Sequence, residues 1–166
     1  MKTKILLFST LIVALSAFSQ VKPQNSTQAP ATNQSVSAEE LNKYATAMDS
    51  VNQLTAAVKD TITAMVNSNK AVSANRYNEL SKIIGDEAKL SAANATPDEI
   101  AFVKKVVERK DQETAKVNQT FQNLAKDYVG VATFNKVKKA LAADTQLKAR
   151  YDSILSIRDK SRQGIN

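Results

Sequence analysis

The feature that most constrains this chain is a long run of apolar residues at helical spacing, which occurs twice. From Ser37 to Asn69, apolar residues recur every three or four positions, with only Thr55 interrupting; they are Leu41, Tyr44, Met48, Val51, Val58, Ile62 and Met65. From Thr96 to Tyr128, Lys110 and Thr114 interrupt the same pattern of Ile100, Val103, Val107, Val117, Phe121, Leu124 and Tyr128. This spacing lines one face of an α-helix, so we predict two long amphipathic helices with coiled-coil-like packing.

Both predicted helices begin with the same local motif. Ser37-Ala-Glu-Glu40 and Thr96-Pro-Asp-Glu99 are capping boxes. In such a box the hydroxyl of the first residue accepts a hydrogen bond from the amide three residues on, and the glutamate there accepts one from the first residue's amide. The acidic residues also favour the positive end of the helix dipole. The sequence therefore predicts helix starts at Ser37 and Thr96.

The composition favours an all-α fold. The 166 residues include only three glycines and three prolines, which argues against an all-β chain with its many turns. We predict a single helical domain at 37–163, folded as an elongated antiparallel helical bundle. The side chains expected to be buried in it are Leu41, Met48, Val58, Ile62, Val107, Val117, Phe121 and Leu124.

The two halves of the domain follow a similar plan. Phe134, Val137 and Leu147 stand in the second half where Tyr77, Leu80 and Leu90 stand in the first. Such agreement at a fixed offset predicts an internal duplication, with repeat units at about 37–94 and 96–160. Each unit is expected to form a helical hairpin, in which a broken return leg runs back along the long helix and covers its apolar face.

The N-terminal segment has the pattern of a secretory signal peptide at residues 1–19. Lys2 and Lys4 precede an apolar run at Ile5–Ala17, which is short for a membrane-spanning helix of roughly 20 residues. We expect cleavage near Ser19 and Gln20 and no transmembrane segment afterwards; an uncleaved anchor is the alternative. Residues 20–36 are a polar leader with almost nothing to bury, expected to be disordered. The predicted location is periplasmic or secreted.

A short motif in each half supports a family resemblance. Arg76-Tyr77-Asn78-Glu79-Leu80 follows the first long helix, and Phe134-Asn135-Lys136-Val137 recurs in the second half, with Thr133 where the first copy has Arg76. An exported chain with these motifs resembles the domain of unknown function 4168 family of small bacterial exported helical proteins. The resemblance covers about residues 38–160 and implies a helical fold and export, but no known activity. The end of the predicted signal peptide is similar to those of Bacteroidetes exports.

The residue inventory argues against catalysis. The chain has no histidine and no cysteine, so the common general base, the common nucleophile and the best transition-metal ligands are missing. Three glycines form no phosphate-binding loop, and no group is available to activate a serine. We therefore expect no enzyme activity, no cofactor and no metal, and the sequence identifies no small-molecule substrate. An enzyme that uses carboxylates alone is the alternative.

Two basic clusters are the candidate binding surface. Arg109 and Lys110 lie in the polar segment 108–116, and Lys136, Lys138 and Lys139 form the densest basic cluster. Each is either a solvated helix face or a binding surface, and segment 108–116 could line a groove between the hairpins. Removing Lys2 and Lys4 with the signal peptide lowers the formal charge from +7 to +5.

The expected function follows from these surfaces. Long apolar faces bury against any matching helix, so we expect an exported, non-catalytic protein that acts by protein–protein interaction or self-association. The alternative is an envelope binder of anionic glycolipid or nucleic acid through basic helix faces. Nucleic acid is disfavoured because no aromatic residues interleave with the lysines.

Overall fold

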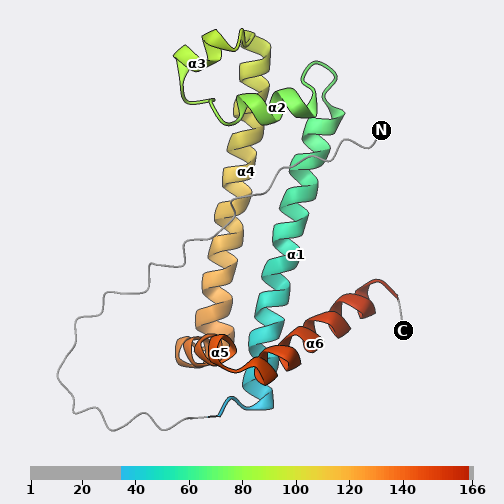
Figure 1. Cartoon of the computed structure of the whole chain (residues 1–166), viewed down its shortest axis with the longest axis vertical. Helices are drawn as coiled ribbons and strands as arrows, with labels where there is room; N and C mark the ends of the chain where they lie inside the picture. Colours follow the sequence, from blue (N-terminus) through green and yellow to red (C-terminus); the bar gives the residue numbers. More distant parts are fainter. Residues whose placement is uncertain (1–34, 165–166) are drawn as a thin grey trace, which may run out of the picture. The chain divides into compact units, whose positions relative to one another are not determined.

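The structure is a computed structural model that describes residues 35–164, and every regular element within this range is a helix (Figure 1). The elements are α1 (Ala38–Ser68), α2 (Ala74–Leu80), α3 (Glu87–Ala92), α4 (Pro97–Asn123), the π-helix η1 (Leu124–Val129), α5 (Val131–Ala143) and α6 (Thr145–Arg162). The all-α prediction is confirmed for these residues. The predicted signal peptide and all but the last two residues of the polar leader lie outside them.

The two long helices begin where the sequence predicts. The Ser37 Oγ accepts a hydrogen bond from the Glu40 amide at 3.1 Å, and the Ser37 amide donates to Glu40 Oε2 at 2.8 Å. The Thr96 Oγ1 likewise accepts from the Glu99 amide at 3.2 Å, and the Thr96 amide donates to Glu99 Oε2 at 2.9 Å. Both capping boxes are therefore confirmed, with Pro97 at the first helical position of α4.

The arrangement of these helices differs from the predicted pair of hairpins. α4 runs antiparallel alongside α1, so the two long helices form one hairpin (Figure 1). α2 and α3 have only seven and six residues and lie at the closed end of this hairpin, while α5 and α6 pack at its other end. Within residues 35–164 no return leg runs back along α1, because α4 itself covers the apolar face of α1. The predicted duplication of hairpins is not confirmed.

Buried side chains gather at the two ends of the α1–α4 hairpin. At the end formed with η1, α5 and α6, the core contains Leu41, Tyr44, Ala47, Val129, Phe134, Val137 and Leu147. The ring of Phe134 lies at its centre, 4.9 Å from the ring of Tyr44 and 5.5 Å from that of Phe121. At the end closed by α2 and α3, the buried side chains are Ile62, Val66, Val72, Tyr77, Leu80, Leu90, Val103 and Val106.

The middle of the hairpin is only two helices thick. No residue of α1 is buried between Asp49 and Ile62, and none of α4 between Val106 and Val117. Of the side chains predicted to be buried, three are buried, namely Leu41, Ile62 and Val117. The other five are only half-buried, namely Met48, Val58, Val107, Phe121 and Leu124. For Val58 and Val107 the reason is that no third helix of the described part of the chain covers the middle of the hairpin.

The π-helix η1 changes which face of the chain points inward. A π-helix has more residues per turn than an α-helix, so it rotates the side chains that follow it. Tyr128, which continues the apolar spacing of α4, is therefore 47% exposed, whereas its neighbour Val129 is buried. Gly130 ends the π-helix with a φ of 85°, a conformation that favours glycine, and α5 begins at the next residue.

Candidate functional site

A groove opens between α1 and α4 at the thin middle of the hairpin. Its volume is about 200 Å³. α1 contributes Leu54, Ala57, Val58 and Thr61, and α4 contributes Arg109, Glu113, Lys116, Val117 and Thr120. We call this the α1–α4 groove. It coincides with the polar segment 108–116 of α4 that the sequence marks as a candidate surface.

The two walls of the α1–α4 groove differ in chemistry. On α1, Leu54 is 39% exposed, Ala57 is exposed and Val58 is half-buried, so this wall is mainly apolar. Leu54 lies beside the interruption of the apolar spacing at Thr55, and sequence reasoning missed both Leu54 and Ala57. On α4, the wall carries Arg109, Glu113 and Lys116. The groove therefore presents an apolar surface opposite a charged one.

One carboxylate holds the two cations of the charged wall. Glu113 Oε1 lies 3.1 Å from Arg109 Nη2 and 3.0 Å from Lys116 Nζ. The hydrogen bond from Lys116, and then the charges of Lys116 and Arg109, hold the pKa of Glu113 below its ordinary value, although burial acts in the opposite direction. Two cations around one anion leave a net positive charge on this wall. Because a guanidinium has five N–H donors, Arg109 keeps donors for an incoming acceptor.

The structure does not bring the five predicted surface residues together. Arg109 lines the α1–α4 groove, and its neighbour Lys110 is half-buried on α4. Lys136, Lys138 and Lys139 lie on α5, at the open end of the hairpin. The basic residues of the candidate surface thus form two separate sites.

Within the α5 group, Lys136 differs from the other two lysines. Its Nζ lies 2.8 Å from Glu40 Oε2 and 2.9 Å from Glu40 Oε1. This ion pair ties α5 to the first turn of α1, and the hydrogen bond from Lys136 is the main cause that lowers the pKa of Glu40. Lys138 and Lys139 are exposed. Lys136 therefore has a structural role, and Lys138 and Lys139 remain accessible.

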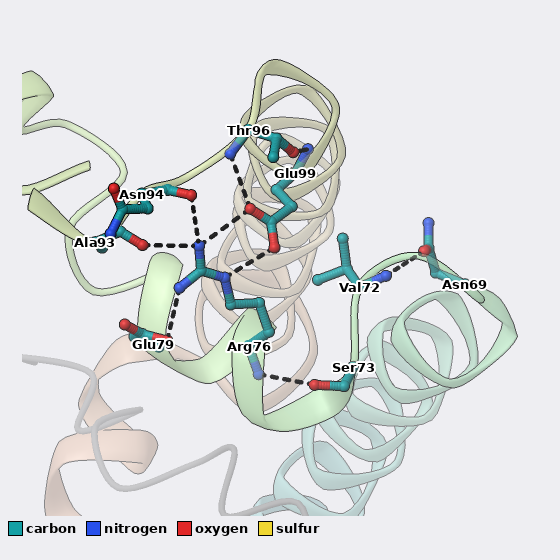
Figure 2. Close-up of polar contacts among 9 residues, drawn as sticks. All are labelled: Asn69, Val72, Ser73, Arg76, Glu79, Ala93, Asn94, Thr96 and Glu99. Carbon is teal, nitrogen blue, oxygen red and sulfur yellow. Dashed lines mark hydrogen bonds and ion pairs between the residues drawn. The ribbon is translucent and has the colours of Figure 1, made fainter. Parts of the chain in front are cut away.

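Arg76, the arginine of the family-like motif, forms the densest polar network at the closed end (Figure 2). Its Nε donates to Glu99 Oε1 at 2.8 Å and its Nη2 to Glu99 Oε2 at 3.1 Å. Its Nη1 donates to Glu79 Oε2 at 3.0 Å, and its Nη2 also donates to the carbonyl oxygens of Ala93 and Asn94. All three guanidinium nitrogens are engaged, so Arg76 clamps α2 to the start of α4.

Glu99 has two roles in this network. It accepts hydrogen bonds from Arg76 and, as the glutamate of the capping box, from the Thr96 amide. The hydrogen bond from Arg76, followed by that from Thr96, lowers the pKa of Glu99 to about 2. The position that corresponds to Arg76 in the second half is Thr133, and an equivalent clamp is not formed there. The Lys136–Glu40 pair instead holds α5 to α1.

An ion pair between Arg162 and Asp49 holds α6 against α1. Arg162 Nη1 lies 2.7 Å from Asp49 Oδ2, and the hydrogen bond with Asp49 raises the pKa of Arg162. Asp49 is the one buried charged residue among those described, and its Oδ2 also accepts a hydrogen bond from Gln53 Nε2 at 3.1 Å. Arg158 Nη2 also donates to Thr46 Oγ1 at 2.7 Å. These contacts add to the packing of Leu147, Tyr151 and Ile154 of α6 against the core that contains the α1 residues Leu41 and Tyr44.

Within residues 35–164, histidine, cysteine, aspartate and glutamate side chains form no group of three or more that could hold a metal ion. No described helix combines the length and the apolar composition needed to cross a membrane. Comparisons of the chain with protein-family models, with curated proteins and with solved structures found no match.

Proposed function

We propose that this chain is an exported, non-catalytic protein that acts by protein–protein interaction through its helix surfaces, and that the α1–α4 groove is the binding site. The observation that supports this proposal is the apolar wall around Leu54, which is exposed opposite a charged wall and is covered by no third helix among residues 35–164. The absence of histidine and cysteine from the sequence supports a non-catalytic role.

The size of the groove favours a protein partner over a small metabolite. Pockets that bury a drug-sized ligand measure about 300–1,000 Å³, whereas the α1–α4 groove measures about 200 Å³. That volume holds apolar side chains projecting from a partner helix, and a helix laid along the hairpin would supply the missing third layer. The net positive charge around Glu113 favours a partner with an acidic residue beside its apolar face.

A matched pair of substitutions tests this site. Ala57→Gln places a larger, uncharged side chain in the α1–α4 groove, whereas Ala56→Gln places the same side chain on an exposed position that does not line it. Both variants are immobilised and incubated with an envelope extract of the source bacterium. We expect a partner that the native chain and Ala56→Gln retain and Ala57→Gln loses. Equal retention by both variants would contradict the proposal, as would copurification of a metabolite that the protein turns over.

Self-association is one form of the same proposal. If a second copy occupies the groove, the mass measured by sedimentation equilibrium rises with protein concentration for the native chain and for Ala56→Gln. Ala57→Gln should stay monomeric over the same range. This measurement distinguishes self-association from binding of another protein.

We propose export to the periplasm or medium of a Bacteroidetes bacterium after cleavage near Gln20, and membership in the domain of unknown function 4168 family. We also propose that the two halves arose by duplication. The support for duplication is that four pairs of corresponding apolar residues are buried in both halves, namely Val72, Tyr77, Leu80 and Leu90 in the first half and Val129, Phe134, Val137 and Leu147 in the second.

A further inference from the structure

The outward face of α5 is the most one-sidedly basic helix surface among residues 35–164. α5 contains three lysines and no acidic residue, whereas every other helix in this range contains at least one aspartate or glutamate. Interspersed charges are typical of an ordinary solvated helix. The absence of acidic residues from α5 sets it apart from the helices around it.

The cations of α5 that remain accessible lie on its solvent face. Phe134 and Val137 point into the core. Val131 and Lys138 are three and four residues from Phe134, so they lie at the edge of the buried face, whereas Lys139 lies about opposite Phe134. All three side chains are exposed. Neither Lys138 nor Lys139 forms an ion pair within the described part of the chain, in contrast to Lys136, which Glu40 neutralises.

Exposed apolar side chains accompany these two lysines. Val131, at the first position of α5, is 48% exposed, and Tyr128, just before Gly130, is 47% exposed. Residues 35–164 include only two other large hydrophobic side chains in the exposed class, Leu54 and Ile157. The exposed side chains of α5 and of the end of η1 thus include an aliphatic one, an amphipathic aromatic one and two unpaired ammonium groups.

We propose that Tyr128, Val131, Lys138 and Lys139, which we call the α5 surface, dock on a lipid bilayer that contains anionic phospholipid. Lysine ammonium groups near a membrane surface are attracted to anionic head groups. A tyrosine and an aliphatic side chain beside them enter the interfacial layer, where a ring has both an apolar and a polar environment. A nucleic acid fits less well, because binding without sequence readout needs several aromatic platforms interleaved with the cations. This docking is independent of the α1–α4 groove.

Replacing the two exposed lysines should lower the affinity of the chain for anionic membranes by a predictable factor. Each lysine near an anionic surface raises membrane affinity about five-fold. Replacing both Lys138 and Lys139 with glutamine should therefore lower binding about 30-fold. Since these charges are exposed, the effect should also shrink as salt is added. Both positions are solvent-facing, so the fold, checked by circular dichroism, should not change.

The test is co-sedimentation of the full-length chain with vesicles of phosphatidylcholine mixed with phosphatidylglycerol, and with vesicles of phosphatidylcholine alone. The matched control is Lys104→Gln with Lys105→Gln, an exposed adjacent pair on α4 that removes the same charge. All variants keep the apolar run at Ile5–Ala17, so its contribution to binding cancels. We expect a preference for the anionic vesicles that the α5 double variant loses and the α4 double variant keeps.

Three results would overturn the proposal. Equal loss in the α4 and α5 double variants would mean that only net charge matters. Equal binding of the native chain to both kinds of vesicle would mean that anionic lipid is not recognised. Salt-sensitive binding of a DNA oligonucleotide that needs Lys138 and Lys139, without any preference for anionic vesicles, would assign the α5 surface to nucleic acid.

A second variant, Val131→Ser, should weaken vesicle binding without changing its dependence on salt.

Discussion

Replacing Phe134 with alanine should destabilise the end of the hairpin that α5 and α6 form. Phe134 is 8% exposed, and its ring contacts those of Tyr44 and Phe121 at centroid separations of 4.9 and 5.5 Å. Truncating a buried phenylalanine costs about 3–5 kcal/mol, because the transfer free energy is lost and a cavity remains. Since both ring pairs are lost together, each worth about 0.5–1.5 kcal/mol, we expect a value near 4 kcal/mol.

Urea denaturation followed by circular dichroism measures this loss. With a slope of about 2 kcal/mol per molar urea for a domain of this size, the midpoint should fall by about 2 M. Ile157→Ala is the control, because that side chain is 62% exposed and its truncation should change stability by about 0.5 kcal/mol or less. A Phe134→Ala cost below about 1.5 kcal/mol would refute the assignment of Phe134 to the centre of this core.

A double-mutant cycle separates burial from ring contact. Phe121 is only half-buried, so Phe121→Ala alone should cost less than Phe134→Ala. The stability lost in the double variant should be about 0.5–1.5 kcal/mol smaller than the sum of the losses in the two single variants, because each single variant already removes the contact between the rings. Strict additivity would mean that the edge-to-face contact of the two rings does not contribute.

Three further predictions test the caps, the turn and the clamp. Ser37→Ala and Thr96→Ala should each lower the free energy of unfolding, measured by urea denaturation, by about 1 kcal/mol, because the amide three residues on loses its hydrogen-bond acceptor. No loss of stability would mean that the fold does not need the capping boxes. Gly130→Ala should cost about 1–2 kcal/mol because φ is 85°, whereas Gly85→Ala, in open space without a positive φ, should cost nothing. The pKa of Glu99 falls from an ordinary 4.5 to about 2 in the folded chain. The stabilisation of the fold by the Glu99 carboxylate, measured as the difference from the Glu99→Gln variant, should therefore be complete above pH 4.5 and vanish as the pH falls to about 2. A difference between the two chains that grows on acidification would contradict the clamp.

Much of the local structure could be predicted from residues that are close in sequence. The capping boxes at Ser37 and Thr96 and the three- and four-residue apolar spacing depend on contacts within one or two helical turns, so they located α1 and α4. The same periodicity could not predict η1, because one wide turn between Leu124 and Val129 has no local marker before the conformationally permissive Gly130. As a result Tyr128 was assigned to the apolar face in place of Val129.

Of the two walls of the α1–α4 groove, only the α4 wall could be predicted from the sequence. Segment 108–116 is visibly polar where an apolar face is expected, which marked Arg109 and its neighbours. Leu54 and Ala57, some fifty residues away, lie in an ordinary amphipathic pattern and carry no local sign that α4 will pass opposite them. Likewise, Lys136, Lys138 and Lys139 look alike in the sequence, and the long-range pair with Glu40 distinguishes them.

By itself the sequence determined that the described chain is helical, where its two long helices start and which of their faces are apolar, because these properties follow from backbone hydrogen bonding and side-chain spacing within a few residues. Tertiary structure alone decided which helix covers which face. An apolar face is buried equally well by a return leg or by a second long helix, and the free energy of burial does not depend on the partner's position in the chain. The choice of α4 as the partner of α1 left the middle of the hairpin two helices thick, and the α1–α4 groove lies there.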